Sequence, residues 1–68
     1  MDEEAFNLSL RKFLKTVGVG SQREIEQAVD KAVASGSIKG TESCPATATI
    51  EIAGLSLKVV FDGEIKLQ

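Results

Sequence analysis

The 68-residue sequence contains no histidine, tryptophan or tyrosine, and it has a single cysteine and a single proline. Without histidine, no side chain with an ordinary pKa near neutrality is present to act as a general base for a nucleophile. A single cysteine cannot form an intramolecular disulfide, and any metal site would depend on oxygen ligands. We therefore expect a protein that is not an enzyme, with no cofactor and with no catalytic, cofactor-binding or metal-ligating residues.

The charge balance is slightly acidic, with 8 basic and 10 acidic residues and a net charge of −2. This balance argues against nucleic acid and anionic membranes as partners, since binding to both depends on clustered Lys and Arg. No stretch reaches the roughly 18 to 20 apolar residues of a membrane-spanning helix. The start at Met1–Glu4 is acidic, whereas a secretory signal begins with basic residues. We therefore expect a cytoplasmic protein with no membrane partner.

Apolar residues recur at helical spacing in the first half of the chain, which predicts two helices. The first covers about 3–17, begins with acidic residues at the positive end of its dipole, and is ended by Gly18. Ser21 and Glu24 have the spacing of a capping box, which predicts a second helix over about 21–35 that stops at Gly36. The short glycine-containing link between the two helices predicts a tight corner, and hence a helical hairpin.

Strict alternation of apolar and polar residues begins after a turn-rich loop at 36–46 and predicts β-strands. Strands over about 47–52 and 55–60 are joined by a two-residue turn at Ala53-Gly54, which sets Ile52 opposite Leu55. We favour a third strand over about 64–67, after a three-residue bulged loop of Phe61, Asp62 and Gly63, because a two-stranded ribbon is marginally stable. The alternative is that the second strand continues without a turn, since Ile65 and Leu67 have odd numbers, like Leu55, Leu57, Val59 and Phe61.

Together these elements predict one α+β domain over residues 1–68. In this fold the N-terminal helical hairpin packs on one face of a C-terminal antiparallel sheet of two or three strands, in the order ααβββ or ααββ.

Few side chains remain that the predicted fold does not need. Cys44 has no histidine to activate it and an acidic neighbour in Glu42, so we interpret it as an inert thiol. The outer face of the first helix differs, because an apolar residue there is surrounded by bases, and it is a possible partner surface. Its residues are Leu8, Arg11, Lys12 and Lys15.

Several segments resemble a family of short, uncharacterised bacterial proteins of unknown function, found mainly in proteobacteria. They are Phe6–Ser9, Arg11–Lys15, Val17–Val19, Ser21–Glu26 and Asp62–Ile65. The resemblance covers most of the chain and implies a free-standing single domain, and it transfers no catalytic residue.

The function we expect is therefore that of a small non-enzymatic interaction or regulatory module. Its partner is another protein or a second copy of the chain, bound through an open sheet edge or through the surface around Leu8. The alternative is a weak nucleic-acid binder that uses the basic outer face of the first helix.

Overall fold

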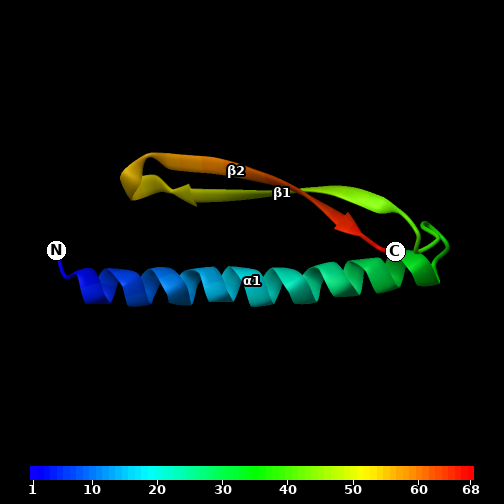
Figure 1. Ribbon diagram of the computed structural model, residues 1–68, viewed down its shortest axis with the longest axis horizontal. Coiled ribbons are helices and arrows are strands. Elements are labelled where there is room, and N and C mark those ends of the chain that lie inside the picture. The colour runs from blue at the N-terminus through cyan, green and yellow to red at the C-terminus, as the bar shows by residue number, and fades with distance from the viewer. The chain divides into compact units, whose positions relative to one another are not determined.

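The computed structural model describes all residues 1–68 and divides into two units, Met1–Ser35 and Gly36–Gln68. The first unit is a single α-helix, and the second is a two-stranded antiparallel sheet (Figure 1). The predicted α+β class is confirmed, with one helix in place of a hairpin and with two strands, the smaller of the two predicted numbers. The elements are α1 (Glu3–Ala34), β1 (Ser43–Ile52), the 3-10 turn η1 (Ala53–Leu55) and β2 (Leu57–Lys66).

The ends of α1 follow from local sequence. Asp2 is the N-cap, and its carboxylate accepts a hydrogen bond of 3.1 Å from the Ala5 N–H, which would otherwise lack a partner inside the helix. Acidic residues occupy the first turn and Lys31 the last, as the helix dipole favours. Gly36, with φ of 79°, adopts the left-handed conformation that follows many helices. The acidic start and the stop at Gly36 are both confirmed.

The predicted corner between two helices is wrong, because α1 continues for 32 residues through Gly18 and Gly20 (Figure 1). A glycine inside a helix costs about 1 kcal/mol relative to alanine, but it keeps its N–H donor and breaks no hydrogen bond. Proline would remove that donor, and the chain's one proline is Pro45. Ser21 and Glu24 consequently lie inside the helix, and the capping box predicted for them does not form.

The two apolar stripes predicted for separate helices overlap only in part on α1. Eighteen residues are about five turns of 3.6 residues, so Leu10 aligns with Ala28, and Leu14 with Ala32. By the same spacing Phe13 aligns with Lys31, so the side that is apolar in the first half of α1 is of mixed polarity in the second half. No residue of α1 is buried.

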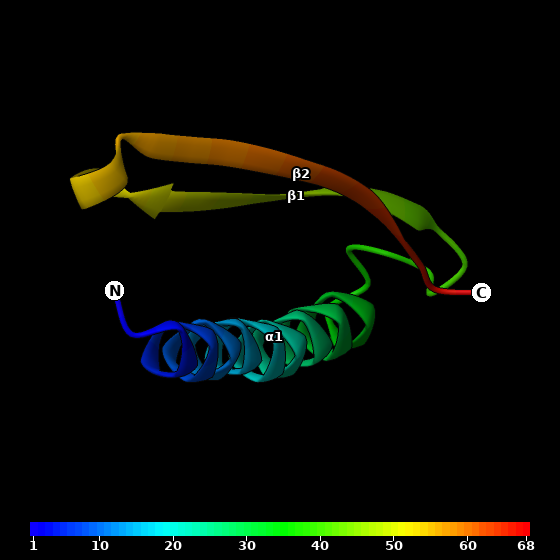
Figure 2. The same cartoon turned by 60° about the vertical axis from the view of Figure 1, so that its left-hand side comes forward.

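The hairpin turn is two residues longer than predicted, because Ile52 lies opposite Leu57 and not Leu55. The chain reverses through η1 and Ser56, whose N–H donates to the Ala53 carbonyl at 3.1 Å (Figure 2). Ser56 has φ of 51° and is the one non-glycine residue with positive φ. The predicted turn fails because the left-handed position falls on a serine, which sequence preference does not indicate.

The sheet has the two faces that were predicted. The observed register differs from the predicted one by two residues, and a shift of two residues keeps each side chain on the same face of the sheet. One face carries apolar pairs and the other carries mainly polar ones, including Glu51 opposite Lys58. The apolar pairs are Cys44 with Ile65, Ala46 with Gly63, Ala48 with Phe61, Ile50 with Val59, and Ile52 with Leu57.

The favoured third strand is wrong, and the alternative of a continuing strand is correct. Asp62 and Gly63 lie inside β2, opposite Thr47 and Ala46. β1 begins at Ser43, so the loop expected over 36–46 is shorter, and each strand has ten residues. A strand that continues along β1 gains ladder hydrogen bonds at every second residue, and this outweighs the turn preference of an Asp-Gly pair.

Replacing Gly18 and Gly20 with alanine should stabilise the protein. A Cβ at either position meets no atom within 4 Å, so each change should raise the free energy of unfolding by about 0.5 to 1 kcal/mol. Thermal unfolding followed by circular dichroism, at one fixed protein concentration, measures the effect. A corner at this point would give the opposite result, because the left-handed conformation of a helix stop costs alanine about 1 to 2 kcal/mol.

Ser56 provides the corresponding test for the hairpin. Ser56→Gly should raise the free energy of unfolding by about 0.5 to 1 kcal/mol, and Ser56→Val should lower it by more than about 1 kcal/mol, because a β-branched residue tolerates positive φ least. Amide hydrogen exchange in β1 and β2 reports the change. Equal protection in the two variants would contradict the left-handed conformation.

Candidate interaction surfaces

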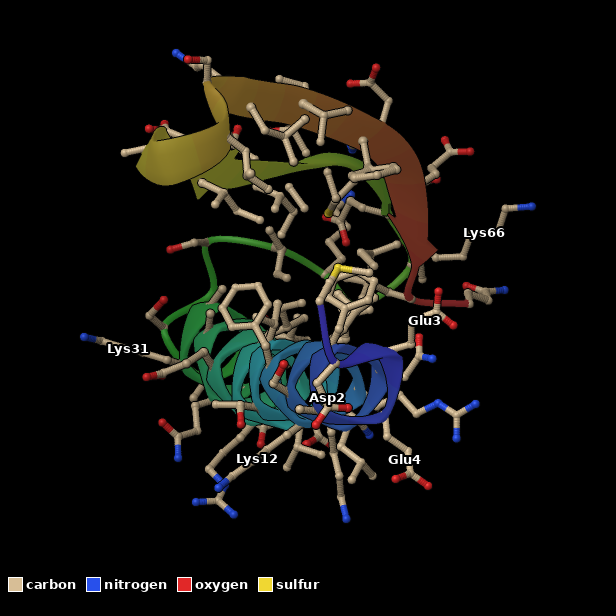
Figure 3. The ribbon with its side chains drawn as sticks, turned by 90° about the vertical axis from the view of Figure 1, so that its left-hand side faces the viewer. Asp2, Glu3, Glu4, Lys12, Lys31 and Lys66 are labelled. Carbon is tan, nitrogen blue, oxygen red and sulfur yellow. The ribbon has the colours of Figure 1, made fainter.

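The predicted partner surface lies on the exposed side of α1 that carries bases. Leu8, Lys12 and Lys15 are spaced i, i+4 and i+7, so they share one side of the helix, and Arg11 lies beside them. Leu8 is 67% exposed, more than any other large apolar residue within α1. Figure 3, which looks along the helix, shows Lys12 and Lys31 projecting from different sides of it. The base-rich cluster therefore occupies one side of α1.

The continuity of α1 changes the character of this surface. Glu26 lies about five turns beyond Leu8, and Asp30 about five turns beyond Lys12, on the same lines along the helix. The side that is basic at residues 11–15 therefore carries two carboxylates at residues 26–30, about 22 Å further along, next to Val29 and Val33, which align with Arg11 and Lys15. Sequence reasoning placed these acidic residues on a second helix and missed this arrangement. A surface with both signs of charge suits a protein partner better than a uniformly negative nucleic acid.

The apolar face of the sheet is the second candidate surface. Phe61 is 58% exposed, Leu57 40% and Ile52 37%, and no residue of the sheet unit is buried. Exposed apolar side chains that are contiguous on one face are typical of interaction surfaces, whereas scattered ones are not.

Cys44 lies in β1, opposite Ile65 on the apolar face of the sheet, and its thiol is free and half-buried. Sequence analysis placed it in a loop, and the structure places it in a strand instead. Its neighbours on this face are apolar side chains, and the nearest carboxylate in the sequence, Glu42, bonds to the backbone. This position is consistent with a thiol that packs as a small apolar side chain.

Glu42 makes an interaction that sequence analysis missed. Its carboxylate accepts hydrogen bonds from three backbone N–H groups, at 2.8 Å from Lys39, 2.9 Å from Gly40 and 3.1 Å from Thr41. Gly40 has φ of 95°, which lets consecutive N–H groups point toward one centre. Such concave groups of N–H donors bind anions. Here the bound anion is the chain's own carboxylate, so Glu42 organises the loop before β1.

These bonds lower the pKa of the Glu42 carboxyl below the usual 4.5. The Lys39 N–H lowers this pKa most, partial removal of water raises it, and the N–H groups of Glu42 itself, Gly40 and Thr41 lower it further. Because the folded-state pKa is depressed, the stabilising effect is complete above pH 4.5 and is lost as the pH falls through the lowered value.

No group of three or more cysteine, aspartate or glutamate side chains lies where it could hold a metal ion. No helix combines the length and the apolar sequence that crossing a membrane requires.

The chain belongs to a family of unknown function, described as "Family of unknown function (DUF6494)", whose match covers residues 1–68. The resemblance drawn from the sequence is thereby confirmed for an uncharacterised family. No curated protein and no solved structure matches the chain.

The Glu42 interaction predicts a local response to pH. The amide resonances of Lys39, Gly40 and Thr41 should shift together, with a midpoint below pH 4.5, because their N–H groups lose the carboxylate acceptor on protonation. Glu42→Gln should abolish this titration and speed hydrogen exchange of the three amides, whereas Glu51→Gln should do neither. A midpoint at or above pH 4.5 would contradict the interaction.

Proposed function

We propose that this member of a family of unknown function is a small non-enzymatic interaction module that acts as a homo-oligomer. The observation that carries the proposal is that neither unit buries an apolar side chain of its own. Burial of apolar surface is the dominant favourable term in folding and association. Each unit therefore gains stability by covering its apolar side chains, and a second copy of the chain supplies the same kind of surface.

The helix unit needs a partner surface for its apolar side. Phe6, Phe13 and Leu14 are about half exposed, at 50%, 46% and 50%. A helix in a protein gains most of its stability from packing of an apolar face and little from intrinsic propensity. Two glycines inside α1 lower that propensity further. Packing against other apolar side chains is therefore the main source of stability available to α1.

The sheet unit has the same need for a different reason. A two-stranded ribbon is marginally stable in water, and three or more strands with an apolar face, or packing against a helix, are needed for independent stability. This sheet has two strands and one apolar face. Association between copies would add strands to the sheet, and oligomerisation is one of the ways in which small domains gain stability.

Nucleic-acid binding is the second candidate, and the clustering of Arg11, Lys12 and Lys15 is what favours it. The acidic residues further along the same side of α1 oppose it, since they would face phosphates. Titration of labelled duplex at low salt should show no binding tighter than about 10⁻⁴ M, the weak end of non-specific affinity. Tighter binding, lost in Lys12→Gln, would favour this alternative.

Self-association is tested by the mass of the protein in solution. Sedimentation equilibrium over two decades of protein concentration should give a mass that rises above the 7.2 kDa of one chain. The physical reason is mass action, because association through exposed apolar surface depends on protein concentration. A mass of one chain at every concentration would contradict the proposed function.

A further inference from the structure

The sheet has two strands, so the outer edge of each strand lacks a partner within the chain. Open edges present unpaired N–H and C=O groups, and these are a template for pairing with another strand. The two edges of this sheet differ in their ability to pair.

The register shows which backbone groups face outward. The Leu67 N–H donates to the Glu42 carbonyl at 3.0 Å, which makes this opposing pair a hydrogen-bonded one. In an antiparallel ladder bonded and non-bonded pairs alternate. The N–H and C=O groups of Thr49 and Val60, which lie opposite each other, therefore point away from the partner strand. The residues of β2 with outward-facing groups are Lys58, Val60, Asp62, Glu64 and Lys66.

The outer edge of β1 lacks one hydrogen-bond donor, whereas the outer edge of β2 has all of its donors. Pro45 occupies one of the outward-facing positions of β1, opposite Glu64, and proline has no N–H to donate. All ten residues of β2 retain their N–H groups. The β2 edge is therefore the one able to pair along its whole length.

We propose that β2 pairs antiparallel with β2 of a second copy, centred on Phe61, so that two hairpins form one four-stranded sheet. This inference rests on the proposed self-association and names its interface. In this register Lys58 lies opposite Glu64 of the other copy, and the opposite charges occur twice because the pairing is symmetric. Directly opposite charges stabilise antiparallel pairs, so the strand is complementary to itself.

The apolar face is equally self-complementary in this register. Phe61 lies opposite Phe61 of the second copy in a non-hydrogen-bonded pair, where side chains approach most closely. Leu57 lies opposite Ile65, and both belong to the apolar face of their own hairpin. The four-stranded sheet therefore has one continuous apolar face, and Phe61, which is 58% exposed in a single chain, contacts another aromatic ring.

Other registers are less favourable. A shift of one residue would set the apolar face against the polar face. A shift that sets Lys58 opposite Lys66 of the second copy also sets Asp62 opposite Asp62 of that copy, so that like charges face each other. The opposite shift, with Lys58 opposite Asp62, leaves Ile65 without a partner. In-register parallel pairing would place every charged residue of β2 beside its own copy.

A matched pair of proline variants tests the interface. Val60→Pro removes an outward-facing N–H from β2, and Thr49→Pro removes the N–H at the opposing position of β1, so neither change costs a hydrogen bond within the hairpin. Sedimentation equilibrium should show Val60→Pro as a single chain, while Thr49→Pro keeps the wild-type mass. Cross-strand nuclear Overhauser effects between β1 and β2 verify that both hairpins form. Equal loss of association in the two variants, or wild-type association of Val60→Pro, would overturn the proposal.

A charge exchange tests the register without altering the backbone. Glu64→Lys and Lys58→Glu should each weaken self-association, by a factor of about two to thirty for two opposing pairs. An equimolar mixture should recover it, because every Lys then faces a Glu of the other variant. A mixture that associates no more than the separate variants would overturn the register.

These results are distinguishable from failure of the proposed function. If the wild-type protein is a single chain at every concentration, both the self-association and this interface are wrong. If it associates and Val60→Pro associates equally well, the module self-associates through another surface, and only the β2 interface is wrong.

Discussion

The antiparallel register of β1 and β2 is the constraint on which the second half of the chain depends. Because opposite residues share a face, setting Ile52 opposite Leu57 places every apolar residue of the strands except Val60 on one side. The same register determines which backbone groups face outward, and it leaves Pro45 on the edge of β1. A register shifted by one residue would mix the two faces and remove both the apolar surface and the difference between the edges.

The uninterrupted helix has a comparable effect on the first half of the chain. Continuity through Gly18 and Gly20 makes the two short apolar stripes overlap in part, along the lines of Leu10 and Leu14. On another side of α1 it aligns the bases around Leu8 with Glu26 and Asp30, so that this side changes the sign of its charge along its length. The surface predicted from the sequence keeps its residues, but its chemistry suits a partner with both charges and not a phosphate backbone.

The sequence predicted which residues form the candidate surface around Leu8, but it did not predict the continuous helix on which they lie. Leu8 and its neighbours are exposed on one side of a helix, as the 3.6-residue period indicates. The Glu42 loop was not predictable, because its three hydrogen bonds come from backbone N–H groups that carry no sequence signature except Gly40. Packing of helical residues on the sheet stays a prediction, and so does a role for the surface around Leu8.

The sequence by itself determined the α+β class, the acidic start of the helical region, its stop at Gly36, and the division of the strands into two faces. The last three depend on local rules: the helix dipole, a left-handed stop, and the two-residue period of a strand. The tertiary structure decided whether Gly18–Gly20 form a corner, where the hairpin turns, and whether Asp62-Gly63 end a strand. At these points the preference of single residues for a turn or a helix stop, about 1 kcal/mol, competes with the cooperative hydrogen bonds of a continuing helix or strand. The cooperative hydrogen bonds are stronger.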